Sequence, residues 1–204
     1  MKTPGVYIVE KSAFPNSVVE APTAIPAFIG ITEKAVNGAD TLSGKPWKIT
    51  SMTEFQQYFG GAPAPEFRLS VVDYPEKDAS KTFYGIPSPD KSKLLRVEAP
   101  EVTFSLYYQM VMFFANGGGT CYIVSAGTYD QKSLIDKEKV VAALTALKKE
   151  QEITMVLVPE AVSVDECKDI QTQVLAHCGE MMNRFAILDV QPKAKENEVM
   201  SEQI

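Results

Sequence analysis

The sequence is poor in the residues that enzymes and metal proteins use for chemistry. Its 204 residues include one histidine and three cysteines. With His177 as the one histidine, a zinc site, a Ser-His-Asp triad and a Cys-His pair all lack parts. We interpret His177 as a half-exposed residue of a helix over 163–182, and we expect no catalytic residue, metal ion or cofactor. The protein is therefore predicted not to be an enzyme.

Motifs that bind phosphates or present a nucleophile are also missing. No P-loop and no GxSxG sequence occurs. The run Gly117–Gly119 follows a helical pattern and precedes a strand, whereas phosphate sites need glycines that lead into a helix. We predict that this run ends the helix in a tight turn, with at least one glycine at positive φ. Asp189, near the end of an expected parallel strand, either caps the next turn or is a functional residue.

Charge and hydropathy argue against further classes of function. The net charge of -6 at pH 7 leaves no basic excess for general binding to nucleic acid or to anionic membranes. No apolar run reaches the roughly 18 residues that cross a bilayer, and no basic segment precedes an apolar one as in a signal peptide. We expect assembly in the cytoplasm without a signal peptide and without membrane insertion.

The three cysteines are not placed to form a disulfide. Cys167 and Cys178 fall on one predicted helix, about 16 Å apart along its axis, and a disulfide needs Cα atoms within about 7 Å. Cys121 begins an expected buried strand. We interpret all three as small core residues of a protein from a reducing compartment.

What the sequence does have is an apolar stretch over 104–125, FSLYYQMVMFFANGGGTCYIVS. Its first part has large apolar residues on nearly every side of a helix, which is typical of a buried helix. We expect Phe113 and Phe114 to lie in the core. The part that begins at Cys121 is short, apolar and partly β-branched, which is typical of an interior strand.

A regular alternation of strands and helices follows. It indicates βαβ units with right-handed crossovers, and thus an α/β fold whose parallel or mixed sheet has helices on both faces. The expected elements are strands over 121–125, 153–158 and 184–190, a helix that begins at 134–137, and a helix that begins at a capping box, Ser163–Glu166. The expected apolar stripe of the first of these helices is Val140, Val141, Leu144 and Leu147.

Upstream of the apolar stretch, the sequence predicts another core strand over 24–31 and a polar surface loop over 37–45. A further capping box, Ser51–Glu54, opens a short helix over 52–59 that Gly60-Gly61 ends. The side chains expected to point inward from this helix are Phe55, Tyr58 and Phe59.

The chain therefore divides into an α/β domain over 23–191 and two flanking segments. Prolines break up residues 62–99, which we interpret as an irregular insertion on the surface of the domain. Within it, 67–72 and 94–97 are expected to pair as antiparallel strands. A polar tail over 192–204 is expected to fray.

Residues 1–22 are interpreted as an extended N-terminal arm and linker. Prolines exclude a long helix there, and Val6–Val9 combines strong strand propensity with no nearby hairpin partner. From the residues alone, this segment is either an edge strand of its own sheet or an arm that adds to the sheet of a neighbouring subunit.

The order of several segments resembles that of one known family. The segments are TPGVYIVE (3–10), AFPNSVVEAPTAIPAFIGITEKA (13–35), WKITSMTEFQQYFGGAP (47–63), FFANGGGTCYIVSAG (113–127) and RFAILDVQ (184–191). Together they resemble the N-terminal half of contractile tail sheath proteins. The likeness is closest to the sheaths of extracellular contractile injection systems, which are phage-tail-like particles of the antifeeding-prophage type.

This resemblance implies a structural subunit that polymerises as stacked rings or a helical sheath around an inner tube and contracts to drive the tube into a target cell. Its partners would be further copies of the chain, the inner tube protein, and baseplate and cap proteins of a released particle. In that family an extended arm completes a sheet of a neighbouring subunit. The residues that match this arm are Thr3, Pro4, Gly5, Val6, Tyr7, Ile8, Val9 and Glu10.

Sheath subunits are usually about twice as long as this chain, so we expect it to be either a fragment or a shortened homologue. Two other functions stay open. One is a baseplate or cap adaptor that shares the first half of a sheath protein. The other is a small ligand-binding domain on a flavodoxin-like sheet, which the βαβ order permits.

Overall fold

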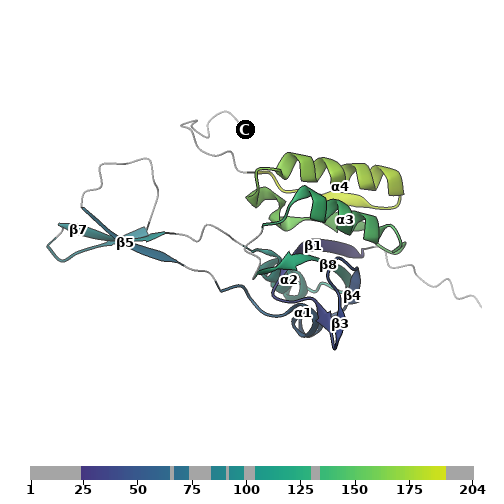
Figure 1. Cartoon of the computed structure of the whole chain (residues 1–204), viewed down its shortest axis with the longest axis horizontal. Helices are drawn as coiled ribbons and strands as arrows, with labels where there is room; N and C mark the ends of the chain where they lie inside the picture. The colour runs from purple at the N-terminus through teal and green to yellow at the C-terminus, as the bar shows by residue number, and fades with distance from the viewer. Residues whose placement is uncertain are drawn as a thin grey trace, which may run out of the picture.

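A computed structural model of the chain describes residues 24–64, 67–73, 84–90, 92–98, 104–129 and 134–191. Figure 1 shows a layered body, in which one sheet separates α1 and α2 from α3 and α4. The predicted α/β fold with helices on both faces of a mixed sheet is confirmed. The predicted arm over 1–22 and the tail over 192–204 lie outside the described residues.

Within the described ranges, five strands form the central sheet in the order β10-β9-β1-β8-β4. The first four are parallel, and β4 is antiparallel to β8. β4 has only three residues and was not predicted from the sequence. The bounds are β1 Pro26–Thr32, β4 Trp47–Ile49, β8 Cys121–Thr128, β9 Met155–Leu157 and β10 Phe185–Ile187.

The central strand β1 confirms the prediction of a core strand over 24–31. All seven of its residues are buried, because helices pack on both faces and strands on both edges. Gly30 sets the distance to α2 (Leu106–Ala115): a Cβ atom there would lie 2.9 Å from Leu106 Cδ2. This glycine therefore permits close packing of the helix against the strand.

Helix α1 (Met52–Phe59) forms as the sequence predicts. Ser51 Oγ accepts a hydrogen bond from the Glu54 N–H at 3.3 Å, and the Glu54 carboxylate accepts one from the Thr50 N–H at 2.6 Å. Gly60 ends the helix at a φ of 89°. The predicted inward residues are buried, except for Tyr58, which is half-buried.

Helix α3 (Lys137–Leu147) begins within the predicted window, and Asp136 caps it by accepting the Lys139 N–H at 2.8 Å. The predicted stripe was wrong at Val141, which is exposed. Ala143 is buried in its place, because the helix presents that side to the sheet and to α4.

The capping box predicted at Ser163–Glu166 was wrong. Pro159–Ser163 forms a 3-10 helix, η2, and α4 (Cys167–Met181) begins without a side-chain cap. The Val164 N–H donates to the Ala161 carbonyl, so Ser163 belongs to the preceding turn. Glu166 is used elsewhere, and its carboxylate accepts the Lys137 N–H at 3.0 Å.

The prediction that α2 is buried nearly all round was also wrong. Leu106 and Met110 are buried, but Tyr108 is 49% and Met112 is 61% exposed. The helix packs with one side against β1 and another against α1, and no described element covers its outer side. The two predicted core residues Phe113 and Phe114 are accordingly half-buried.

The insertion over 62–99 is more regular than predicted. Its described residues form a second sheet in the order β5-β7-β6, with all pairs antiparallel. This confirms the pairing of 67–72 with 94–97 and adds β6. The strands are β5 Arg68–Asp73, β6 Tyr84–Pro87 and β7 Lys93–Glu98. Figure 1 shows this projecting sheet standing away from the body.

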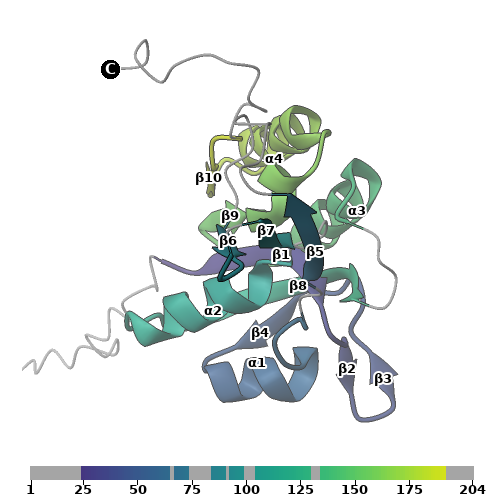
Figure 2. The same cartoon turned by 90° about the vertical axis from the view of Figure 1, so that its left-hand side faces the viewer.

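Two turns complete the fold. Gly117 ends α2 with a φ of 84°, which confirms the predicted positive φ in this glycine run. The loop predicted over 37–45 includes a small hairpin of β2 (Val36–Asn37) and β3 (Asp40–Thr41). In Figure 2 this hairpin lies beside α1, at the end of the molecule opposite α4.

Candidate functional site

The first candidate site is the topological switch point of the sheet. In doubly wound sheets, ligands bind beyond the carboxyl ends of the strands where the strand order reverses. Here the chain places β8 on one side of β1 and β9 on the other. The switch point therefore lies beyond the ends of β1 and β9, where η2 begins.

The carboxylate of Glu160 occupies this position. The residue is 2% exposed. Its carboxylate accepts hydrogen bonds from the N–H groups of Ile31 at 2.8 Å, Ser105 at 3.0 Å and Leu106 at 3.2 Å. The last two belong to the beginning of α2, where a bound phosphate would otherwise be held. The protein thus supplies its own anion at the place where related sheets hold a ligand.

Burial and hydrogen bonding shift the pKa of Glu160 in opposite directions. Burial raises the pKa of Glu160 to about 7, and the three N–H donors act in the opposite direction. Burial and the negative charge of Glu160 both raise the pKa of Tyr129. The Tyr129 ring stacks on Phe104 with 4.8 Å between centroids. The carboxylate is therefore suited to hold β1, η2 and α2 together.

Sequence reasoning missed Glu160. Its local signal is slight, because it is one acidic residue that follows a strand and Pro159. Its three donors come from residues 31, 105 and 106, which are distant in the sequence.

The interpretation of His177 as half-exposed was wrong, since it is 4% exposed. Its Nε2 lies 3.3 Å from Arg184 Nη1. Arg184 also donates to the carbonyls of Leu147 at 3.1 Å and Glu150 at 2.8 Å, just where α3 ends. Burial and the charge of Arg184 lower the pKa of His177. This pair has a structural role that links α4 to the end of α3.

Asp189 lies beyond β10 and is exposed. Its backbone carbonyl accepts a hydrogen bond from Gln171 Nε2 at 2.6 Å, which ties this segment to α4. The three cysteines are free, as predicted, with Cys121 and Cys167 buried and Cys178 half-buried.

Two features are absent from the described ranges. No group of three or more His, Cys, Asp or Glu residues in them could hold a metal ion. No helix in them is long and apolar enough to cross a membrane.

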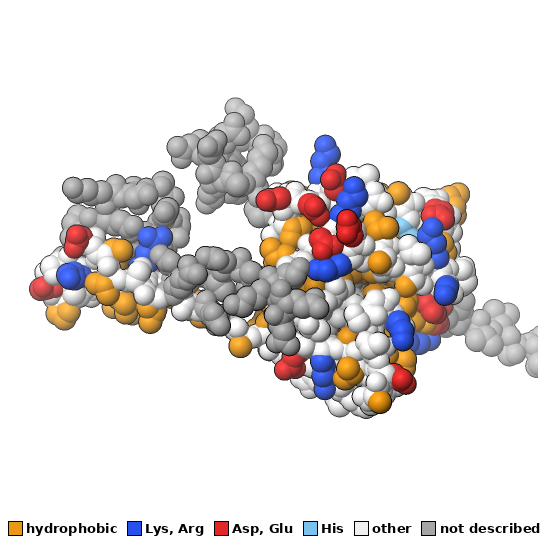
Figure 3. Space-filling view, in the orientation of Figure 1, with side chains coloured by type: hydrophobic (Ala, Val, Ile, Leu, Met, Phe, Trp, Pro, Cys, Tyr) orange, Lys and Arg blue, Asp and Glu red, His pale blue; other side chains and the backbone are white. Residues whose placement is uncertain are grey.

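The second candidate site is one face of the projecting sheet. The register aligns Leu69 with Val97, Val71 with Leu95, and Ile86 with Leu95, so these side chains share a face. Hydrophobic side chains gather along one side of this sheet in Figure 3. We call this surface the projecting apolar face. Its exposed members are Phe67, Leu69, Val71, Ile86 and Leu95, which are 37–67% exposed.

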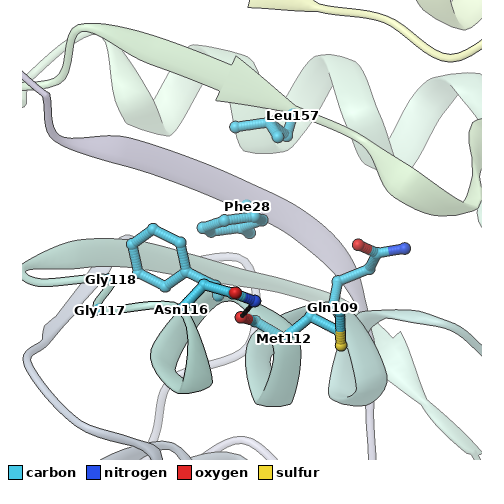
Figure 4. Close-up of a pocket in the computed structure, with 8 residues that line it drawn as sticks. Phe28, Gln109, Met112, Asn116, Gly117, Gly118 and Leu157 are labelled. Atoms are coloured by element: carbon cyan, nitrogen blue, oxygen red, sulfur yellow. Dashed lines mark hydrogen bonds between the residues drawn. The ribbon is translucent and has the colours of Figure 1, made fainter.

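The third candidate site is a groove of about 450 Å³ beside α2. In Figure 4, Gln109 and Met112 of α2 lie on one side of the groove and Leu157 of β9 on the other, with Phe28 at its base. Asn116 is held by a hydrogen bond to the Met112 carbonyl at 2.7 Å. None of the lining residues is charged, so the groove suits an apolar occupant rather than an ionic ligand.

The arm residues Thr3 to Glu10, the predicted contact with a neighbouring subunit, lie outside the described residues. Comparison with models of known protein families and with curated proteins finds no match for this chain. The three candidate sites differ in their chemistry. One is closed by an internal carboxylate, and the other two are exposed and apolar.

Proposed function

We propose that the chain is a structural subunit of a contractile tail sheath, which polymerises around an inner tube and contracts to drive that tube into a target cell. The proposal includes assembly in the cytoplasm and a place in a released, phage-tail-like particle. Its partners are further copies of the chain, the inner tube protein, and the baseplate and cap proteins.

The observation that carries the proposal is the projecting apolar face. Its five large hydrophobic side chains lie on one side of a sheet that stands away from the body. Exposed apolar patches of this kind mark surfaces that bind other proteins. The segments that resemble sheath proteins then specify the kind of assembly.

The switch point supports an assembly protein over the ligand-binding alternative. A small molecule there would have to displace the Glu160 carboxylate from three N–H donors and leave this buried group without those partners. The loss of those three hydrogen bonds opposes that exchange. A baseplate or cap adaptor would bind its partners through the same surfaces, but it would not form a tube.

Negative-stain electron microscopy of the purified full chain tests the proposal. A sheath subunit is expected to form tubes or stacked rings. Short rings that never stack would favour the adaptor, and single domains at every concentration would contradict both assembly functions.

Variants of the arm test how the copies are linked. Deletion of residues 1–20 is expected to abolish tubes and leave the melting temperature of the body nearly unchanged, because an arm strand is stabilised by the sheet it joins. Ile8→Pro in the full chain should do the same, since proline removes an N–H from the strand. Ser17→Pro, in the predicted linker, is the matched control. Unfolding of the body by the deletion would mean that the strand belongs to its own sheet.

A further inference from the structure

The five-stranded sheet is covered unequally on the side of α2. Parallel register places Phe28, Leu157 and Ile187 in one row, and Pro26, Met155 and Phe185 in the next. Phe28 is 5% exposed under α2, Leu157 is half-buried, and Ile187 is 44% exposed. Pro26 is buried, Met155 half-buried, and Phe185 57% exposed. Exposure thus rises from β1 to β10 in both rows.

The uncovered part of the sheet has the width of one helix. Adjacent strands lie about 4.8 Å apart, so β9 and β10 together present roughly 10 Å. Packed helices lie about 8–10 Å apart. On the opposite face, α4 packs on β10, and no described element does so on the α2 side. We call the exposed surface of Met155, Leu157, Phe185 and Ile187 the open sheet face.

Helix α2 is an uncharged helix with an uncovered side, and an apolar sheet face packs well against a helix of this kind. Its ten residues, LYYQMVMFFA, include no charge. Its exposed side chains are mostly apolar, with Tyr108 49%, Val111 38% and Met112 61% exposed, and Gln109 is the exposed amide among them. The groove between α2 and β9 is also uncharged. An exposed apolar helix and an apolar slot for one helix therefore lie side by side on one molecule.

We propose that two copies of the chain pack through this surface, with α2 of each copy on the open sheet face of the other. A two-fold contact of this kind is self-complementary, because each copy offers the same helix and the same slot. It also places the nearly all-apolar sequence of α2 between two sheets. This two-fold contact joins only two copies, whereas the proposed linkage through the arm can continue from copy to copy.

The area available is at the lower end of the range for stable contacts. Six side chains contribute, and each large side chain that is about half exposed offers roughly 100 Å². The total is on the order of 600 Å² per copy, against roughly 800 Å² per partner in typical stable complexes. The six are Tyr108, Val111, Met112, Leu157, Phe185 and Ile187.

Cysteine cross-linking in the full chain tests the contact. Met112 lies on the groove side of α2, so a two-fold axis between the two α2 helices brings it close to Met112 of the other copy. Under mild oxidation, Met112→Cys is expected to form a covalent dimer at least about 10-fold faster than Leu175→Cys. Leu175 is the matched control, because it is 54% exposed on α4 at the opposite face. The unmodified chain controls for its own cysteines.

Light scattering gives an independent measurement. Met112→Asp should weaken dimerisation at least about 10-fold, because docking would bury an unpaired carboxylate, whereas Leu175→Asp should not. Equal cross-linking rates, or a dimer that survives Met112→Asp, would overturn the proposal. A monomer whose Met112→Cys thiol resists labelling would also overturn it, because the slot would then be covered from within the same chain.

The two-fold contact and the proposed sheath function can be tested separately. Ile8→Pro is expected to abolish tubes and retain the Met112→Cys dimer. If tubes form normally while Met112→Cys cross-links no faster than Leu175→Cys, the sheath proposal stands and the two-fold contact does not.

Discussion

The two faces of the central sheet differ in how completely they are covered. On one face, α3 and α4 span the sheet from β8 to β10, and Val156 of β9 is fully buried beneath them. On the other, α1 and α2 cover the sheet only as far as β1, and Ile187 remains 44% exposed. Both faces include a buried hydrophobic cluster, but the first is covered across its width. The second leaves apolar surface available for association.

The largest expected effect tests this difference directly. Ile29→Ala, on the α3 and α4 face, should lower the free energy of unfolding by about 2–5 kcal/mol because it leaves a cavity. Ile187→Ala, on the open sheet face, should cost less than about 1 kcal/mol because the side chain is already partly in water. Urea unfolding at a concentration that keeps the chain monomeric measures both. Similar costs at the two positions would show that the faces are equally buried.

Glu160→Gln is expected to have the next largest effect. The amide keeps one acceptor oxygen, so at least one of the three N–H donors loses its partner, at a cost of about 1–3 kcal/mol. Urea unfolding at pH 8 measures the loss. Full stability of this variant would mean that the carboxylate does not hold α2 to the sheet.

The free energy of unfolding of the wild type should also depend on pH through Glu160. The pKa of Glu160 is raised from 4.5 to about 7, so the folded protein binds more protons than the unfolded chain between these values. The free energy of unfolding should therefore fall as pH rises from about 4.5 to 7. His177, whose pKa is lowered, acts in the opposite direction but is present in both proteins. The difference between wild type and Glu160→Gln isolates Glu160, and a difference that rises with pH would contradict the assignment.

Gly117→Ala should cost about 1–2 kcal/mol, because its φ of 84° is unfavourable for a residue with a Cβ atom. Gly119→Ala is the matched control two residues later, where an added Cβ meets nothing within 4 Å and φ is not positive. Thermal unfolding of both variants measures the effect. Equal melting temperatures would mean that the end of α2 can rearrange freely.

The smallest expected effect compares one helix cap on each face. Asp136→Ala at α3 and Ser51→Ala at α1 should each cost about 1 kcal/mol, because each removes one side-chain acceptor from a backbone N–H. Caps act locally, so the two costs should be similar despite the unequal coverage of the sheet. A much smaller effect at Ser51 would indicate that α1 unfolds independently of the body.

Local patterns predicted most of the sheet and one helix cap correctly. The β-branched run at Cys121, the strand over 24–31 and the capping box at Ser51 depend on neighbouring residues, and all are present. The box at Ser163 failed because Pro159 begins a 3-10 turn that takes in the serine. β4 and β6 were missed because neither is an apolar run: β4 (WKI) includes a lysine, and β6 (YGIP) includes a glycine and a proline.

The candidate sites were harder to predict because they depend on distant residues. Periodicity showed that α2 is apolar on most sides, but not that one side lacks a covering layer. Glu160 bonds to Ile31 across 129 positions of sequence, and no local pattern reports such a contact. The groove also depends on distant residues. Its lining comes from β1, α2 and β9, which are separate in the sequence and meet only in the folded structure.

The order of synthesis makes the central strand β1 prone to aggregation while the chain is being made. β1 is synthesised before its neighbours β8 and β9, which begin at Cys121 and Met155. Until they are made, PAFIGIT is an apolar strand with both edges unpaired, the kind of segment that promotes aggregation and that chaperones bind. Translation that stops between Thr32 and Cys121 leaves this strand without either neighbour. Nascent chains of this protein should therefore depend on chaperones until β8 and β9 have emerged.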